Sequence, residues 1–309
     1  MARIVICIAT CMRPQGLHRT LASLARLDTV HALHVLVADN DVERQEGIAV
    51  VERVASDGYR WPIEALLVRE RGIPFARNSL TQAALARPDI DYVAMLDDDE
   101  ACSRGWIDAL TEAAIQWNAD VVGGTVLREM DRPVATWVAR HPLLQAKRRG
   151  QSGPVPLVDS TANILISARA LSAMGSRPFD DRLALTGGED KQLFTRMQRA
   201  GFRFAWSEEA VVTELIPATK VTARWLLMRG YRLGMTDMMV ERFHRGRLRT
   251  FAGEAPRIAA GFLVGTLGAA ATLDRGKRVV RLGKLYRAAG KIAGLVGITY
   301  EEYRKVHGA

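Results

Sequence analysis

The sequence predicts an α/β fold in which a parallel sheet is covered by helices on both faces. Two observations support this class. The first hundred residues alternate short apolar runs, rich in β-branched side chains, with stretches of helical spacing. The apolar runs are nearly continuous, as expected for strands buried on both faces. With 309 residues, 48% of them hydrophobic, the chain is long enough for one large domain or a domain with an appendage.

Strand and helix alternate through the first third of the chain. The predicted strands are 4–10, 33–38, 63–68 and 91–96, and the predicted helices between them are 17–27, 47–55 and 74–86. This alternation is typical of a parallel sheet, whose ligands gather outside the carboxyl ends of the strands. The polar clusters 39–41 and 97–100 follow strands directly, so we expect both at that edge.

The next part of the chain resumes with strands and a helix around a long connection. Strands are predicted at 120–127 and 163–167, and a helix at 189–200, which Gly201 ends. Residues 128–158 carry four prolines and two glycines and predict a long loop. Because long loops in compact domains are often functional, we expect this loop to shape a substrate pocket.

Positive charge is concentrated in the last third of the chain. Residues 217–309 hold 18 Lys and Arg against 6 Asp and Glu, a net of +12, whereas residues 1–216 hold 25 against 28, a net of −3. This asymmetry indicates an anionic partner, a lipid surface or a nucleic acid. Aromatic residues are not interleaved with the basic ones as stacking platforms, which excludes nucleic acid as the expected partner.

Two C-terminal stretches bear on membranes. Residues 258–273 lack charge but fall short of the roughly 20 residues that span a bilayer. Basic residues then recur at helical spacing at Arg278, Arg281, Lys284, Arg287 and Lys291. We interpret this stretch as a basic amphipathic helix that lies on an anionic membrane. The alternative is a helix packed on the sheet with its basic face in solvent.

The N-terminus and the cysteines indicate a cytoplasmic protein. A proline and further arginines interrupt the first apolar run before the core of a signal peptide could form. The three cysteines, Cys7, Cys11 and Cys102, cannot all pair within the chain. We therefore expect a reducing compartment.

The carboxylates Asp97, Asp98 and Asp99 stand together at the end of an apolar strand. Adjacent carboxylates repel one another unless a cation compensates. Mg²⁺ or Mn²⁺ prefers carboxylate oxygens and keeps positions open for phosphate oxygens, so Asp97 and Asp99 are candidate metal ligands. The alternative is a solvated surface cluster, which the preceding strand 92–96 disfavours.

A second acidic element, Gly187-Gly188-Glu189-Asp190, opens the predicted helix 189–200. Here one carboxylate could accept the proton of an acceptor hydroxyl while the other orients that hydroxyl. An ordinary helix cap is an equally good interpretation of the residues alone.

Two further residues could bind a nucleotide. Arg77 could place a positive charge against a diphosphate, although an ordinary surface arginine is the simpler interpretation. Asp39 could accept from a nucleobase or a ribose hydroxyl, or form an Asx turn.

The segments CIATCMRP, VLVADND, GIPFARN, VAMLDDDE and GGEDKQLFTRM, in this order, resemble the signature of the family 2 glycosyltransferases. Within that family the likeness is to the rhizobial succinoglycan-biosynthesis glucosyltransferases. It covers nearly the whole chain, and is strong to about residue 235. It implies a GT-A fold at 1–217, with a nucleotide-sugar half at 1–125 and an acceptor half at 126–217, followed by a helical, membrane-associating region at 218–309.

The resemblance also implies roles for matching residues. The donor would be bound by Thr10, Arg13, Asp39, Arg77, Asp97 and Asp98; the metal, Mg²⁺ or Mn²⁺, by Asp97 and Asp99; the acceptor by Gly188, Glu189 and Trp206. Asp190 would be the catalytic base, assisted by Glu189. One position departs from the pattern, because Thr213 stands where relatives often carry a histidine that could complete the metal shell.

The function implied is an inverting transfer of glucose or another hexose from a nucleotide-sugar donor, in particular a UDP-sugar. The expected acceptor is a lipid-linked oligosaccharide of exopolysaccharide biosynthesis at the cytoplasmic face of the inner membrane. Two alternatives remain open: a transferase of the same fold with a soluble or protein acceptor, and a non-catalytic membrane scaffold.

Overall fold

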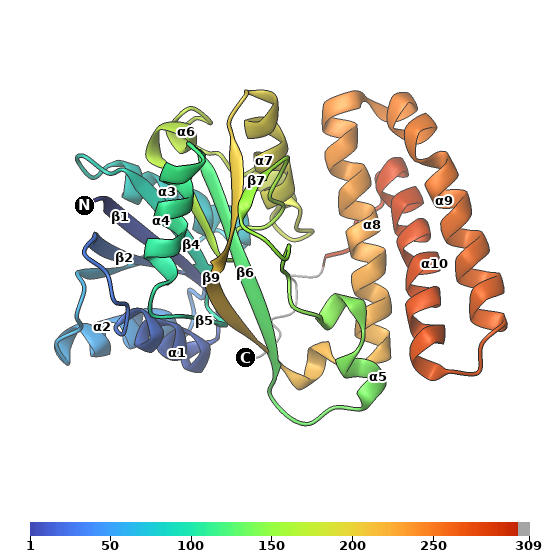
Figure 1. Ribbon diagram of the computed structural model, residues 1–309, viewed down its shortest axis with the longest axis horizontal. Coiled ribbons are helices and arrows are strands. Elements are labelled where there is room, and N and C mark those ends of the chain that lie inside the picture. Colours follow the sequence, from blue (N-terminus) through green and yellow to red (C-terminus); the bar gives the residue numbers. More distant parts are fainter. Residues whose placement is uncertain (302–309) are drawn as a thin grey trace.

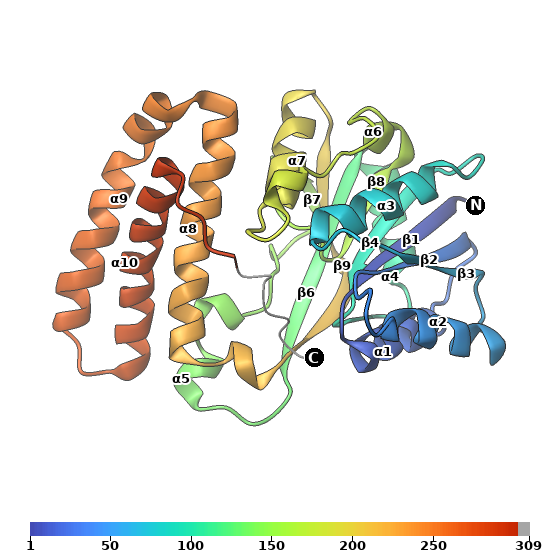
Figure 2. The same ribbon diagram turned by 180° about the vertical axis from the view of Figure 1, so that it is seen from behind.

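The computed structural model describes residues 1–301. A central sheet with helices on both faces forms the larger part of the molecule, and three long helices stand side by side at one end (Figures 1 and 2). The predicted C-terminal region 218–309 corresponds to these helices, and its last residues, 302–309, lie outside the described part of the chain.

The sheet is mixed, and its first half is the predicted parallel array. The strands are β1 (Arg3–Thr10), β2 (Ala32–Asp39), β3 (Ile63–Leu67), β4 (Tyr92–Asp97), β5 (Glu100–Cys102), β6 (Val121–Met130), β7 (Gly153–Val155), β8 (Ile164–Ser167) and β9 (Phe204–Ile216). Their order is β3-β2-β1-β4-β8-β6-β9-β5, and β7 also pairs with β9. Strands β3, β2, β1 and β4 all run parallel, so their carboxyl ends meet at one edge.

The second half of the sheet departs from a purely parallel arrangement. Strand β8 runs antiparallel to both of its neighbours, β4 and β6, while β9 runs parallel to β6. The connection from β6 to β8 is the long segment that the prolines predict. It contains no long helix that could carry the chain back along the sheet to start a strand parallel to β6. The chain therefore re-enters the sheet in the reverse direction.

Helices cover both faces of the sheet, as predicted. One face is covered by α1 (Pro14–Leu24), α2 (Glu46–Ser56) and α4 (Trp106–Gln116), and the other by α3 (Ile73–Leu85), α6 (Ala168–Ser172) and α7 (Glu189–Arg199). Side chains that alternate along β1 divide between two cores: Ile4, Ile6 and Ile8 pack with α1 and α4, whereas Val5 and Cys7 pack with α3. The period of two along a strand thus separates the cores.

Two local features go beyond the sequence analysis. No element is predicted at residues 103–119, where α4 buries Trp106, Ile107 and Leu110 against the sheet at helical spacing. The predicted loop 128–158 contains short regular pieces: the end of β6, then α5 (Thr136–Ala139), the 3₁₀ turn η1 (Pro142–Leu144) and β7.

The C-terminal helices are α8 (Ala223–Arg245), α9 (Arg247–Ala270) and α10 (Arg275–Val296), which follow the short turns η2 (Asp181–Leu183) and η3 (Ala218–Lys220) in the chain. Helix α10 packs against both α8 and α9, which touch each other little, so it is the middle helix (Figure 1). Glycines allow the close approach. A Cβ at Gly290 would overlap the carbonyl oxygen of Tyr231, and one at Gly265 would overlap Leu285.

The expectation that the basic stretch of α10 lies on an anionic membrane stays a prediction, but several of its basic residues have partners within the bundle. Arg287 pairs with Asp237 of α8 at 2.7 Å, Lys291 pairs with Glu254 of α9, and Arg281 donates to the carbonyl oxygen of Gly268. These cations hold the bundle together. The alternative, a helix packed on the sheet, does not describe α10 either, because it packs mainly against the helices α8 and α9. Within residues 1–301, no helix combines the length and apolarity needed to cross a bilayer.

Candidate active site

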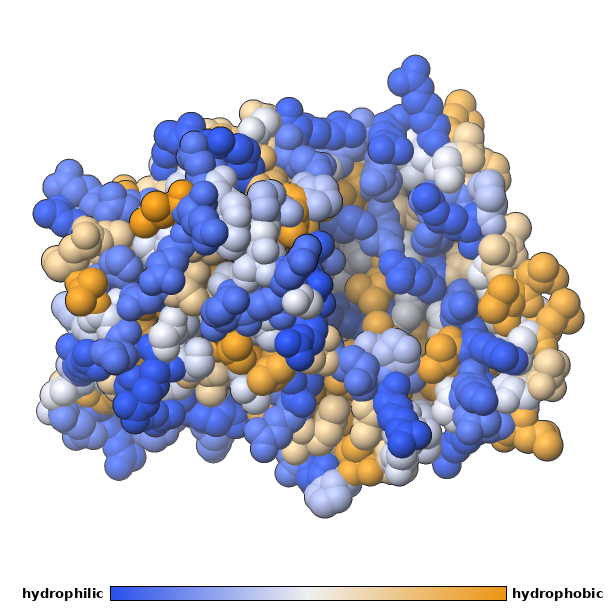
Figure 3. Space-filling model, viewed as in Figure 1, coloured by the Kyte–Doolittle hydropathy of each residue, from blue (hydrophilic) through white to orange (hydrophobic). Residues whose placement is uncertain are grey.

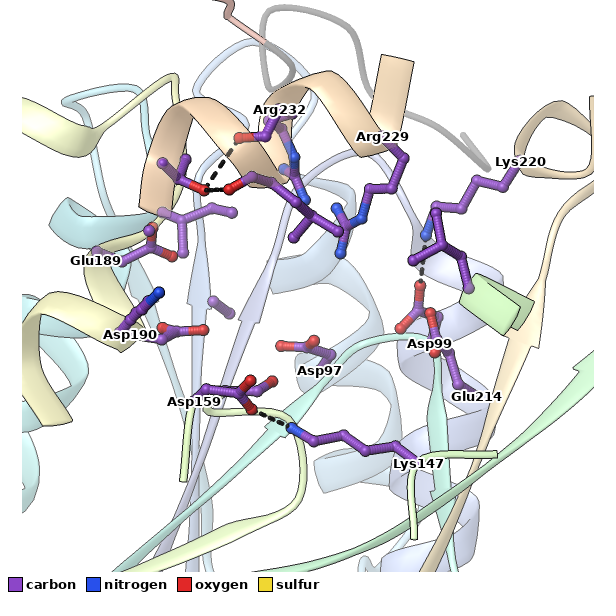
Figure 4. Close-up of a pocket in the computed structure, with 18 of the residues that line it drawn as sticks. Asp97, Asp99, Lys147, Asp159, Glu189, Asp190, Glu214, Lys220, Arg229 and Arg232 are labelled. Atoms are coloured by element: carbon purple, nitrogen blue, oxygen red, sulfur yellow. Dashed lines mark hydrogen bonds and ion pairs between the residues drawn. The ribbon is translucent and has the colours of Figure 1, made fainter. Parts of the chain in front are cut away.

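A cavity of about 720 Å³ lies between the carboxyl edge of the sheet and helix α8. Figure 4 shows carboxylates and cations that converge on it from both sides. The wall on the sheet side includes Asp97 and Asp99, the wall at the start of α7 includes Glu189 and Asp190, and α8 contributes Arg229. The two acidic elements predicted from the sequence, about ninety residues apart in the chain, therefore border one space.

Of the three adjacent aspartates, Asp98 is held inside the protein. Its carboxylate accepts from the hydroxyl of Thr10 at 2.8 Å and from Arg13 at 2.8 Å, and the residue is only 4% exposed. Asp97, at the end of β4, faces the cavity. Desolvation there outweighs the nearby guanidinium of Arg77, and together with the neighbouring carboxylates raises the pKa of Asp97 to about 6.

Asp99 is shared between two cations, Arg13 at 3.3 Å and Lys220 at 3.5 Å. Among the described residues, no three His, Cys, Asp or Glu side chains form a ready metal-binding group. A bound Mg²⁺ nevertheless needs only one or two carboxylates, because waters and substrate phosphates supply its other ligands. Asp97 and Asp99 both line the cavity, so the donor set fits such an ion if Lys220 and Arg13 share the Asp99 carboxylate with it.

Arg77 stands at the centre of the site. From α3 it reaches Glu189 at 2.6 Å, Asp190 at 2.5 Å and Asp97 at 3.4 Å, and it is 8% exposed. It is therefore a buried cation that joins the two acidic elements, and not the surface arginine of the simpler interpretation. Buried charges of this kind are tolerated because each finds an opposite charge.

Two glycines set the start of α7. Gly187 and Gly188 have φ of 77° and 99°, a backbone region that favours glycine, and they turn the chain so that both acidic side chains border the cavity. Asp190 accepts from the backbone N–H of Thr161 at 3.2 Å and from its hydroxyl at 3.1 Å. The N-cap residue of α7 is Gly188, so Glu189 and Asp190 stand in the first turn of the helix and not at the cap position itself.

Glu189 is almost completely buried, with its side chain 3% exposed. Desolvation, together with the neighbouring Asp190, raises the pKa of Glu189 to about 7 in spite of its ion pair with Arg77. Such a carboxyl changes its protonation state near neutral pH, so the charge of this wall of the cavity depends on pH.

The structure brings most of the predicted site residues together and leaves two away from the cavity. Asp39 has no exposed surface, and its carboxylate accepts from the backbone N–H groups of Asp41 and Ile48, which is the Asx-type alternative. Trp206 is 1% exposed; its ring N–H donates to Glu208 and it packs in the sheet. Neither lines the cavity. A direct contact of Trp206 with an acceptor is therefore not available in this conformation.

Strand β9 places Glu214, and not Thr213, beside the cavity. Glu214 and Ile216 line it, whereas Thr213 points to the other face, as the alternation of a strand requires. Glu214 pairs with Arg128 at 2.9 Å. The absence of a histidine at position 213 therefore removes no side chain from the wall of the cavity.

Sequence reasoning missed the contribution of the C-terminal helices. Lys220, Trp225, Arg229 and Arg232 line the cavity from η3 and α8, and Lys147 lines it from the loop. The surplus of positive charge after residue 217 could have indicated cations at the cavity. The same surplus is equally consistent with cations on the outer surface. The wall is also braced, because Asp237 of α8 pairs with Lys191 of α7 at 2.5 Å.

Comparison with known proteins decides the family. Residues 5–175 match the model of glycosyl transferase family 2. The chain belongs to this family. The family 2 glycosyltransferase described here is also 33% identical, over 308 residues, to the succinoglycan biosynthesis protein ExoM of Rhizobium meliloti (strain 1021), with 96% of this chain and 93% of ExoM covered. The resemblance stated from the motifs is thereby confirmed.

The fold of this glycosyltransferase is also found in solved structures. A crystal structure of S. aureus TarS matches with a TM-score of 0.51 and 14% identity over 96% of this chain and 54% of that one. A structure of TarS residues 1–349 matches equally well and is covered over 92% of its length. At this identity the likeness concerns the fold alone. It confirms the predicted sheet flanked by helices and followed by a helical region.

Proposed function

We propose that this family 2 glycosyltransferase is an inverting hexosyltransferase that uses a nucleotide-sugar donor, in particular a UDP-sugar. The observation that carries the proposal is that the two acidic elements line one cavity and are joined there by the guanidinium group of Arg77. The aspartates 97–99 are suited to bind the leaving diphosphate, and Glu189 and Asp190 are suited to bind the attacking hydroxyl. A single displacement needs these two functions on opposite sides of the reacting carbon.

Asp190 is the base in this proposal. The acceptor hydroxyl transfers its proton to the Asp190 carboxylate while its oxygen attacks the anomeric carbon, and the bond from that carbon to the diphosphate breaks with inversion. Thr161 fixes the carboxylate through two hydrogen bonds, one to each oxygen, which limits the rotation of the group. Glu189 is the neighbour that orients the acceptor.

The cations along the cavity stabilise the departing diphosphate. Arg13, Arg77 and Lys220 all lie within ion-pair distance of the aspartate cluster, so they stand where negative charge develops. Asp97 and Asp99 would hold Mg²⁺ or Mn²⁺. When bound, that ion supplies Lewis-acid stabilisation of the leaving group.

The acceptor is proposed to be a lipid-linked oligosaccharide of exopolysaccharide synthesis. Two observations support this: the similarity to ExoM, a protein of succinoglycan biosynthesis, and the net charge of +12 after residue 216. An anionic lipid surface would attract such a segment. We accordingly propose that the protein works as a peripheral protein at the cytoplasmic face of the inner membrane.

Calorimetric titration with nucleoside diphosphates tests the donor site. UDP is expected to bind more tightly with Mn²⁺ or Mg²⁺ than with a chelator, and more tightly than the other nucleotides. A different preferred nucleotide would change the donor class. No binding of any nucleotide under either condition would favour the non-catalytic scaffold and reject the transferase.

The variant Asp190→Asn tests the base. Removal of a general base costs about 10²–10⁴-fold in rate, so transfer should fall by at least that much while the affinity for nucleotide changes little. The matched control is Asp159→Asn, at a cavity-lining aspartate paired with Lys147. Near wild-type turnover of Asp190→Asn would remove Asp190 from this role.

A further inference from the structure

The outer surface of α9 is apolar and has no partner among residues 1–301. We define the α9 outer face as the exposed residues of the uncharged stretch that ends this helix and its turn: Ala259, Ala260, Leu263, Val264, Leu267, Ala270, Ala271 and Leu273. Leu263 is 60% exposed, Leu267 63% and Leu273 95%. Figure 3 shows apolar residues gathered along this edge of the molecule.

The spacing of these residues makes the surface continuous. They recur at three- and four-residue intervals, so they lie on one side of the helix, opposite Ile258, Gly265 and Ala269, which face the bundle. Thr266 is the one polar residue among the exposed positions between 258 and 272, and none of them is charged. A solvated helix of a soluble domain normally carries its charges on this side.

Basic residues stand at both ends of the α9 outer face. Arg249 and Arg257 precede it, and Arg275, Lys277 and Arg278 follow it, all of them exposed. Acidic residues nearby are engaged: Glu254 pairs with Arg257 and Lys291, and the side chain of Asp274 caps α10. The surface therefore combines an apolar centre with positive ends.

We propose that the α9 outer face docks on an anionic lipid bilayer. Apolar side chains of an interfacial helix enter the boundary between headgroups and acyl chains, while flanking Lys and Arg contact anionic headgroups. A second copy of this chain is a poorer occupant, because two equally basic bundles would repel each other. This inference deepens the proposed membrane attachment, on which it rests, and moves the contact from the basic residues of α10 to the apolar edge of α9.

Flotation with lipid vesicles tests the surface. The full chain is mixed with vesicles of phosphatidylcholine alone or with added phosphatidylglycerol, and bound protein is measured at several salt concentrations. The double variant Leu263→Gln, Leu267→Gln removes apolar surface without changing charge. Ile115→Gln, at an apolar position 70% exposed on α4, is the matched control.

We expect the wild type and the control to bind the anionic vesicles and the double variant to bind them roughly tenfold or more weakly. Binding to phosphatidylcholine alone should be weaker for all three proteins. If the double variant bound the anionic vesicles as tightly as the wild type, the α9 outer face would be rejected as the docking surface. The proposed membrane attachment would still stand. Failure of the wild type to bind would overturn both.

Two further measurements separate the alternatives. Light scattering over a range of protein concentrations reports self-association; a dimer that the double variant converts to a monomer would assign the face to a second copy and overturn the proposal. Nucleotide binding in vesicle-free solution should be the same in the double variant and the wild type. If the wild type itself bound no nucleotide, the proposed transferase activity would be rejected. That result would not affect the proposed lipid-binding surface.

Discussion

At the scale of single residues, the site is a network of buried opposite charges. Arg77 contacts three carboxylates, and Asp99 contacts two cations. In the proposed reaction, the donor diphosphate and a metal ion would bind by sharing or replacing these ion pairs. These ion pairs therefore predict how the stability of the protein responds to pH and to the loss of one charge.

Glu189 should make stability depend on pH. Its pKa is about 7 in the folded protein against an ordinary value of 4.5, so between these values the folded state binds more protons than the unfolded state and stability falls as pH rises. Glu189→Gln removes this cost. We compare the free energy of unfolding of the variant with that of the wild type at each pH. This difference should shift in favour of the variant by roughly 2 kcal/mol between pH 5 and pH 8.

Urea unfolding at the two pH values measures this difference. Glu43→Gln, at an exposed position, serves as the control and should shift stability equally at both pH values. An offset for Glu189→Gln that does not change between pH 5 and pH 8 would contradict the prediction.

Lys220 should compete with metal for Asp99. Its ammonium lies 3.5 Å from that carboxylate, and neither group is more than 16% exposed. Lys220→Met should therefore bind Mn²⁺ several-fold more tightly in the absence of nucleotide, as measured by the electron paramagnetic resonance signal of free Mn²⁺. Lys147→Met, which removes a cation paired with Asp159 at the same cavity, should leave this affinity unchanged. Weaker Mn²⁺ binding by Lys220→Met would show that the lysine does not occupy the metal position.

At the scale of elements, the bundle depends on close contact between helices. Glycines of α10 lie against the backbone of α8: a Cβ at Gly290 would overlap the carbonyl of Tyr231, and one at Gly294 would overlap that of Met235. Helices at this distance cannot accept larger residues without moving apart. Because α8 also lines the cavity, its position matters to the site.

Two alanine substitutions in α10 should have opposite effects. Gly290→Ala forces α8 and α10 apart and should cost about 3 kcal/mol of stability. Gly283→Ala meets nothing within 4 Å and should stabilise by up to about 1 kcal/mol through helix propensity. Thermal unfolding of the two variants and the wild type measures whether each substitution raises or lowers stability. A Gly290→Ala protein as stable as the wild type would contradict the close contact between α8 and α10.

At the scale of the whole molecule, the catalytic part and the bundle share a core. Val138 and Leu144 of the loop region and Ile216 of β9 pack with Leu226 of α8 and Val279 of α10. The predicted boundary at 217 therefore divides the sequence by charge but cuts through a hydrophobic cluster. The bundle is part of the site as well as a candidate attachment to lipid.

A fragment of residues 1–217 should not be an independent domain. It loses Leu226 and Val279 from the shared core and Lys220 and Arg229 from the cavity. We expect it to aggregate, or to unfold at a lower temperature than the full chain, and to bind nucleotide more weakly. Size-exclusion chromatography and calorimetry of the fragment measure this. A monomeric fragment with the stability and nucleotide affinity of the full chain would show that the bundle is only an appendage.

The sequence by itself determined the first half of the sheet, the family and most of the candidate catalytic side chains. Those features are local, because strand and helix periods and the residues that follow each strand depend on near neighbours in the chain. Asp97 and Asp190 are recognisable as acidic elements from such short segments.

Only the tertiary structure decided which distant groups meet. The ion pairs of Arg77 with Glu189 and of Lys220 with Asp99 join residues more than a hundred positions apart. The same holds for the burial of Trp206, the antiparallel insertion of β8 and the place of α10 between α8 and α9. Packing of the complete chain sets these contacts and also determines which side of α9 is left uncovered, because a helical period shows that a face is apolar but not what covers it.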